Sequence, residues 1–69
     1  MNPVTLGQAL AEARKAKGVT QEQLSGRCGL SREMVRKVEG GHYFPRLPHM
    51  VALCRALGCS VDSIVEKAR

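Results

Sequence analysis

Residues 21 to 38 restrict the possible fold more than any other part of the chain. Thr20 and the glutamine three residues after it have the spacing of a capping box, which predicts a short helix that ends near Gly29. Ser31 is a good N-cap for a second short helix, which ends at the glycine pair 40–41. The apolar residues that both segments offer to one core are Leu24, Cys28, Leu30, Val35 and Val38. Two short helices that share these contacts across a turn can cross at a steep angle, as in a helix-turn-helix unit.

Capping residues and glycines divide the rest of the chain into three more helices. Thr5 begins another capping-box pattern, and the apolar residues after it keep helical spacing until Gly18. Pro48 suits a first helical position, and apolar residues recur after it at helical spacing as far as Gly58. Ser60 is placed to cap a last helix. No segment has the pattern of a strand or a repeat, so the sequence predicts a compact all-α fold of five helices.

The length and the charge of the chain limit what it can do. With 69 residues it can hold one small domain with a modest core, so we expect a single domain over residues 1–69. Lysine and arginine number 11 against 6 aspartate and glutamate, a formal net charge of +5, which favours anionic partners such as nucleic acid or an acidic membrane surface. The chain has no long apolar run and no pattern of a cleavable leader, so we expect a cytoplasmic protein that does not enter a membrane.

No metal, cofactor or disulfide is expected. Cys28, Cys54 and Cys59 form an odd set without a Cys-x-x-Cys pair, and each occupies an apolar position where a small core residue is typical. His42 and His49 do not stand three or four residues from a cysteine or from each other, a spacing that is common among zinc ligands. The chain also lacks a catalytic triad, a paired-carboxylate site and a glycine-rich phosphate loop, so an enzyme is not expected.

The segments GVTQEQLS, GLSREMVRKVEGG and LPHMVALCRALGCSVDSI belong to a pattern that extends from residue 5 to residue 65. In this pattern the chain resembles the Cro/cI-type helix-turn-helix repressor family, also called XRE-like or lambda-repressor-like. The resemblance implies a five-helix domain whose third helix enters the major groove of DNA, usually as a homodimer on a two-fold-symmetric operator. It also implies that Gln21 contacts the DNA backbone and that Arg14 and Glu39 form a partly buried ion pair.

The helix after Ser31 is predicted to have one buried and one exposed face. With about 100° between successive residues, Val35 and Val38 define the buried side, and Met34 lies at the boundary. The charged residues that fall on the opposite side are Arg32, Glu33, Arg36 and Lys37. A solvated helix face is one explanation, because Glu33 and Lys37 also have the favourable i, i+4 order of a stabilising ion pair.

DNA recognition is the other explanation for this face. Arg32 and Arg36 suit forked hydrogen bonds to guanine O6 and N7. Glu33 can accept a hydrogen bond from cytosine N4, and Met34 can contact a thymine methyl group. Lys37 can reach either a base or a phosphate.

Phosphate contacts are expected mainly at the start of the preceding helix. Its first turn presents unpaired backbone N–H groups and the positive end of the helix dipole. The predicted phosphate contacts are Thr20, Gln21, Arg27 and His42.

The last helix is the predicted dimer interface. The residues expected there are Leu57, Val61, Ile64 and Val65, which can instead complete the core of a single chain. Tyr43 and Phe44, in the loop after the glycine pair, either stack on a neighbour across a dimer or cover the core.

These features predict a sequence-specific transcriptional regulator of bacterial, phage or plasmid type. It would act as a dimeric repressor on double-stranded DNA, without a small-molecule ligand, and would associate with the nucleoid when bound. The alternative is a DNA-binding antitoxin or another interaction module that acts with a partner protein.

Overall fold

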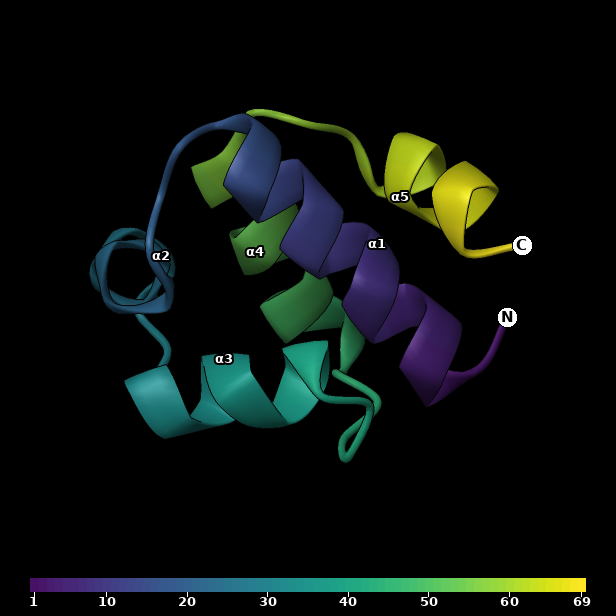
Figure 1. Ribbon diagram of the computed structural model, residues 1–69, viewed down its shortest axis with the longest axis horizontal. Coiled ribbons are helices and arrows are strands. Elements are labelled where there is room, and N and C mark those ends of the chain that lie inside the picture. Colours follow the sequence, from purple (N-terminus) through teal and green to yellow (C-terminus); the bar gives the residue numbers. More distant parts are fainter.

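The computed structural model describes all of residues 1–69 and contains five helices and no strand (Figure 1). The helices are α1 (Pro3–Ala16), α2 (Gln21–Cys28), α3 (Arg32–Glu39), α4 (Leu47–Leu57) and α5 (Val61–Ala68). This arrangement confirms the predicted compact all-α fold of five helices.

Local capping explains where three of the helices begin. Thr20 Oγ1 accepts a hydrogen bond from the Gln23 backbone N–H at 3.0 Å, and Gln23 Oε1 accepts one from the Thr20 N–H at 2.9 Å. The hydroxyl oxygens of Ser31 and Ser60 cap α3 and α5. Gly29 ends α2 with a φ of 76°, a left-handed conformation that glycine adopts without steric cost. The predictions for these start and stop residues are confirmed.

Two helices begin earlier than the sequence pattern predicted. Asn2, not Thr5, caps α1: Asn2 Oδ1 accepts a hydrogen bond from the Thr5 N–H at 2.9 Å, and Thr5 Oγ1 accepts one from the Asn2 N–H at 3.1 Å. Pro3 follows as the first helical residue, where its fixed φ suits the helix. Helix α4 begins at Leu47, and Pro48 is its second residue, a position whose N–H has no partner within the helix anyway.

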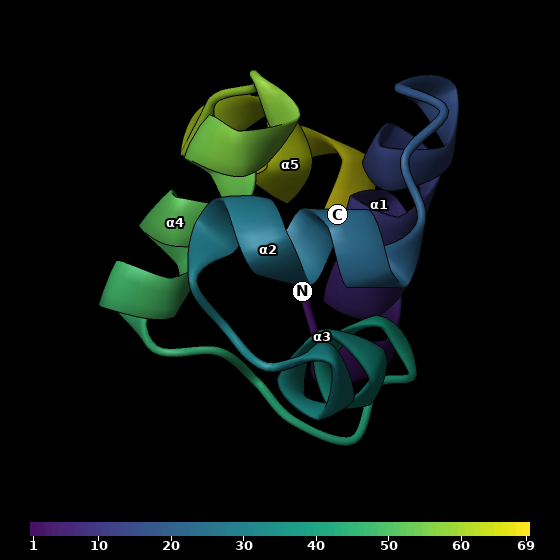
Figure 2. The ribbon, with the colours of Figure 1, turned by 90° about the vertical axis from the view of Figure 1, so that its left-hand side faces the viewer.

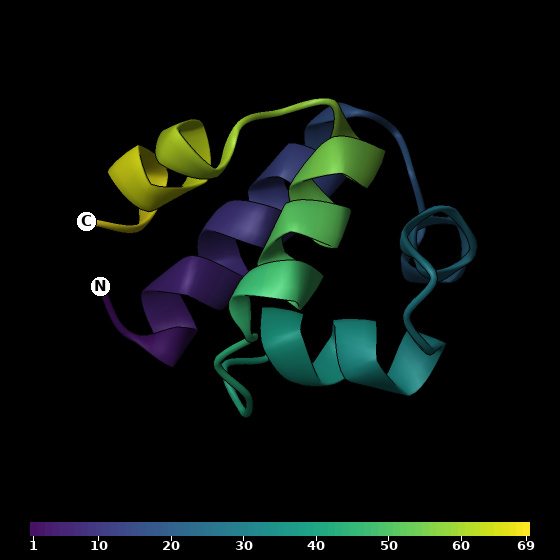
Figure 3. The same ribbon diagram turned by 180° about the vertical axis from the view of Figure 1, so that it is seen from behind.

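Helix α1 is the centre of the packing. It packs against α3 and α5, while α4 lies behind it in Figure 1 and in front of it in Figure 3. Figure 2 shows α2 from its side and α3 nearly along its axis, which is the steep crossing expected of a helix-turn-helix. The buried hydrophobic residues are Leu6, Ala9, Leu10, Val19, Leu24, Val35, Val38, Met50, Leu53, Cys54, Leu57, Ile64 and Ala68. Every helix contributes to this one core.

Two of the four residues predicted for a dimer interface lie in the core instead. Leu57 is 2% exposed and Ile64 is 1% exposed. A side chain with almost no accessible surface has none to offer a second chain, so the interface prediction is wrong for these two residues. Val61 and Val65 remain partly exposed on α5.

The cysteines are free thiols in or beside the core. Cys54 is buried, and Cys28 and Cys59 are partly buried against the core, as predicted for small apolar residues. Burial, with a smaller effect of the neighbouring Cys59, raises the pKa of Cys54 to about 12. This side chain is therefore a protonated thiol at neutral pH.

Gly7 sets how closely α1 approaches α3. A Cβ atom added at Gly7 would lie 2.6 Å from the Glu39 carbonyl oxygen and would also collide with the Val38 carbonyl oxygen. Both obstacles are backbone atoms, so only a shift of one helix against the other can relieve the contact. The position of α3, and with it the exposed face of α3, therefore depends on a residue without a side chain.

We expect Gly7→Ala to lower the free energy of unfolding by about 1 kcal/mol or more, because overpacking at the crossing outweighs the higher helix propensity of alanine. Gly26→Ala is the matched control, since Gly26 is also helical but has no atom within 4 Å of its added Cβ. That variant should be as stable as the parent chain or more stable. Urea denaturation of both variants measures the difference, and equal stability would contradict the close approach.

Candidate nucleic-acid interface

Helix α3 has the two faces that its sequence predicted. Val35 and Val38 are buried, and the exposed residues of the other face are Arg32, Glu33, Arg36 and Lys37. Met34 is partly buried against the core, which leaves only part of its side chain free for contact with a base. The interior valines thus hold the helix so that its charged residues point outward.

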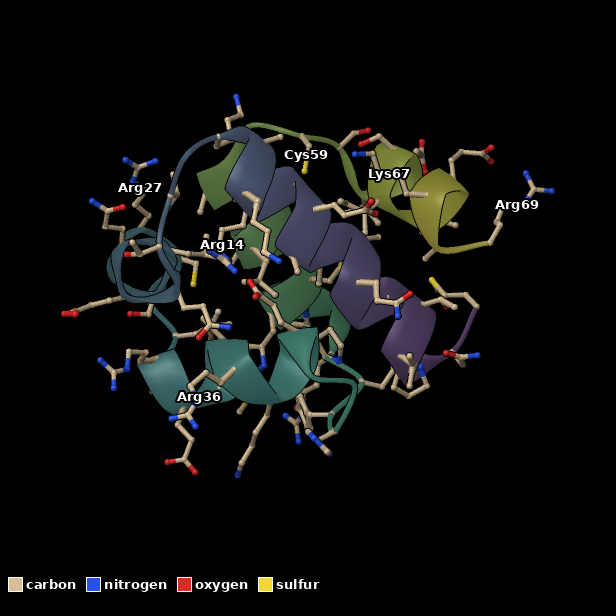
Figure 4. The ribbon with its side chains drawn as sticks, in the orientation of Figure 1. Arg14, Arg27, Arg36, Cys59, Lys67 and Arg69 are labelled. Atoms are coloured by element: carbon tan, nitrogen blue, oxygen red, sulfur yellow. The ribbon has the colours of Figure 1, made fainter.

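The three cations of this face differ in their surroundings. Lys37 Nζ lies 3.6 Å from Glu33 Oε1 within α3, and both side chains are more than half exposed. Arg32 Nη1 lies 3.8 Å from Glu22 Oε1 of α2. Arg36 has no carboxylate within 4.0 Å, and Figure 4 shows its side chain at the surface of α3. Arg36 is therefore the cation of α3 that is most available to an external anion.

A polar hollow of about 580 Å³ lies between the start of α2 and α3. Its lining residues are Arg14, Thr20, Gln21, Glu22, Arg32 and Arg36. The hollow brings together two residues predicted to contact phosphates, Thr20 and Gln21, and two predicted to contact bases, Arg32 and Arg36. Thr20 Oγ1 accepts the capping hydrogen bond of α2, and its hydroxyl proton is still able to bind an anion.

Beneath this hollow, a partly buried ion pair joins α1 to α3. Arg14 Nε donates to Glu39 Oε2 at 2.8 Å and Arg14 Nη2 donates to Glu39 Oε1 at 3.1 Å, a bidentate geometry. The side chains are 12% and 6% exposed, respectively. Arg14 Nη1 also donates to the Val19 carbonyl oxygen at 2.8 Å. The ion pair that the family resemblance implies is present in the structure.

Gln21 belongs to the same network, which sequence reasoning missed. Its Nε2 donates to Glu39 Oε1 at 3.0 Å, so the first residue of α2 is tied to the last residue of α3. The two residues are 18 positions apart, and no local pattern signals their contact. This bond fixes the orientation of the Gln21 amide while its carbonyl oxygen and second N–H stay available.

A second hollow, of about 470 Å³, lies at the other end of α3. It is lined by Glu33, Arg36, Lys37, Gly40 and His42. Gly41 has a φ of 79° and turns the chain so that the His42 N–H donates to the Lys37 carbonyl oxygen at 2.9 Å. His42 is thereby placed beside the exposed face of α3.

The remaining predicted residues lie apart from this face. Arg27 is exposed on the last turn of α2 and lines neither hollow, and Figure 4 shows it pointing away from α3. Tyr43 packs partly against the core, whereas Phe44 is 45% exposed. The two residues were expected either to cover the core or to stack on a neighbour across a dimer. Only Tyr43 covers the core.

The structure contains no cluster of three or more His, Cys, Asp and Glu side chains that could hold a metal ion. None of its helices combines the length and the apolar character that crossing a membrane requires.

The chain is similar to known proteins over nearly its whole length. A family model described as a helix-turn-helix domain matches residues 5–66. The immunity repressor protein of Bacillus phage phi105 is 37% identical over 62 residues, which cover 90% of this chain and 43% of the phage protein. An uncharacterized HTH-type transcriptional regulator of Methanothermobacter thermautotrophicus is 41% identical over 49 residues, 71% of each chain. The chain thus spans less than half the length of the phage repressor.

Two solved structures resemble the fold closely. The restriction-modification controller protein C.AhdI of Aeromonas hydrophila has a TM-score of 0.88 and 37% identity, and the match covers 90% of this chain and 94% of that protein. The clp gene regulator ClgR of Corynebacterium glutamicum has a TM-score of 0.93 and 30% identity, and the match covers 96% of this chain and 70% of that one.

Proposed function

The chain belongs to the Cro/cI-type helix-turn-helix family of transcriptional regulators, and from this premise we propose that it is a dimeric repressor that reads a specific DNA sequence with α3. The observation that carries the proposal is the exposed face of α3, where Arg36 has no intramolecular partner and Arg32 makes no hydrogen bond within the chain. A helix that carries exposed guanidinium groups opposite a buried valine pair suits insertion into the major groove.

The proposed base contacts come from five residues of α3. Arg36 and Arg32 would each fork onto a guanine, and Glu33 would accept a hydrogen bond from a cytosine amino group. Met34 would contact a thymine methyl group with the part of its side chain that the core leaves free. Lys37 would bind a base or a phosphate, at the expense of its exposed pair with Glu33.

The proposed phosphate contacts flank α3 on both sides. Thr20 and Gln21 lie at the start of α2, where the backbone N–H groups and the helix dipole favour an anion. His42 lies at the other end of the exposed face. Contacts of this kind set the position of the reading helix on the duplex and carry no base information. Arg27 contributes at most to the overall field, because it points away from the others.

Selection of bound duplexes from a random pool tests the proposal. We expect the recovered sequences to share a motif that repeats with two-fold symmetry, with half-site centres roughly 34 Å apart. A pool that stays random after selection would instead favour an interaction module that acts through a partner protein.

The proposed dimer interface lies on α5. Of the predicted residues, Val61 and Val65 retain accessible surface, and Val65 is not among the side chains packed on the core. Such a small apolar patch supports only weak association, so we expect a monomer at low concentration and a dimer on DNA.

Val65→Glu should therefore reduce the occupancy of a two-half-site duplex from two chains to one, as measured by sedimentation of the complex. The matched control is Leu47→Glu, which places the same charge on a 69% exposed side chain of α4. If Val65→Glu lowers the occupancy no more than Leu47→Glu does, the dimer interface is not on α5.

A further inference from the structure

Glu22 is the one carboxylate that faces the hollow at the start of α2. It is the second residue of α2, and its Oε1 lies 3.8 Å from Nη1 of Arg32 on α3. The Glu22 side chain is 72% exposed and that of Arg32 is 60% exposed. A negative charge therefore stands where the first turn of α2 would otherwise attract a phosphate.

Stability does not account for this placement. Ion pairs between two largely exposed side chains contribute little to folding, because water and salt screen them. The partly buried pair of Arg14 and Glu39 already joins the helices beneath the hollow. The main effect of Glu22 is therefore on the net charge that the hollow presents to a ligand.

The cations around the hollow are not equally available to an external anion. The charge of Arg14 is neutralised by Glu39, which leaves Arg32 and Arg36 as the cations that can meet an anion. At 3.8 Å the contact between Glu22 and Arg32 is too long for a hydrogen bond, and the Arg32 guanidinium donates none within the chain. Arg32 therefore keeps its N–H donors free, while the neighbouring carboxylate offsets its charge.

This combination separates two ways of binding DNA. Attraction to a phosphate depends mainly on net charge, so it weakens for a cation that has a carboxylate beside it. Forked hydrogen bonds to a guanine depend on donor geometry and are still possible. On random DNA Arg32 meets mainly phosphates, whereas the proposed operator places a guanine opposite it.

We propose that Glu22 is a specificity-determining residue, which weakens binding to random DNA by offsetting the charge of Arg32 and by repelling phosphate from the start of α2. The inference rests on the proposed function, since it concerns the same DNA-facing surface. Glu22 raises specificity by disfavouring the complex with random DNA, and it makes no favourable contact with DNA itself.

Glu22→Gln in the full chain tests this role. On a random-sequence duplex of about two helical turns, the variant should bind roughly threefold more tightly, with a slope of log K against log salt that is steeper by up to about one unit. The matched control is Glu12→Gln, which changes the net charge equally at an exposed residue of α1 that has no ion-pair partner. In an Arg32→Ala background the gain from Glu22→Gln should shrink.

Two results would overturn the proposal: equal gains for Glu22→Gln and Glu12→Gln, or a loss of affinity for the random duplex. The same gain with and without Arg32 would overturn the part played by Arg32 and leave only the repulsion of phosphate from the start of α2. A second comparison uses the tightest duplex recovered from the random pool, on which Glu22→Gln should gain less than on the random duplex. If the parent chain shows no preferred sequence, the proposed sequence-specific function fails, and the random-duplex comparison still decides whether Glu22 weakens binding to DNA.

Discussion

Glu39→Gln is expected to lower the free energy of unfolding by about 3 kcal/mol, a large share of what a domain of this size possesses. Glu39 accepts two hydrogen bonds from Arg14 and one from Gln21, so one carboxylate holds α1, α2 and α3 together. The substitution preserves the shape of the side chain and removes its charge. The Arg14 guanidinium, which is 12% exposed, is then left without a counter-charge in a poorly hydrated place. Thermal and urea denaturation measure the loss.

Glu66→Gln is the matched control for this prediction. Glu66 Oε2 also lies 2.8 Å from an arginine, Arg69, but both side chains of that pair are more than two thirds exposed. Breaking this exposed pair, which has one hydrogen bond of the same length, should change stability by less than about 0.5 kcal/mol. If the two variants unfold alike, burial of the Arg14–Glu39 pair does not contribute to the stability of the fold.

Arg36→Ala is expected to cost about 1 to 3 kcal/mol of binding free energy on the preferred operator and to relax the base preference at one position in each half-site. The Arg36 side chain has no ion pair and no hydrogen bond within the chain, so its removal breaks no polar contact and the effect belongs to DNA binding. Binding to a random duplex should change less. Titrations on the selected duplex and on single-base variants of it measure both quantities.

Two further substitutions distinguish base contacts from phosphate contacts. Lys37→Ala should flatten the slope of log K against log salt by roughly one unit if Lys37 binds a phosphate, and should alter the base preference if it reads a base. Gln21→Ala should weaken binding to all sequences nearly equally, and its melting temperature must be checked because it also loses the bond to Glu39. If all three variants stay folded and keep both affinity and preference, the charged face of α3 is only a solvated surface.

The sequence by itself determined the elements and the faces that they bury. A capping bond joins residues three positions apart, so Thr20, Ser31 and Ser60 could be assigned from their neighbours alone. Helical periodicity placed Val35 and Val38 inside and the cations of α3 outside for the same local reason. At the start of α1 the prediction from the Thr5 pattern was wrong, because Asn2 caps the helix three residues earlier.

Only the tertiary structure decided what each face meets. Periodicity assigned Leu57, Ile64 and Val65 to the apolar side of their helices, but the packing of α1, α4 and α5 covers the first two and leaves the third accessible. The bond of Gln21 to Glu39 and the contact of Glu22 with Arg32 each join residues on different helices. Such contacts depend on the angle and distance at which helices cross, which Gly7 helps to set through its close approach to the backbone of α3. A local pattern carries no information on that geometry, because the atoms that determine it come from distant parts of the chain.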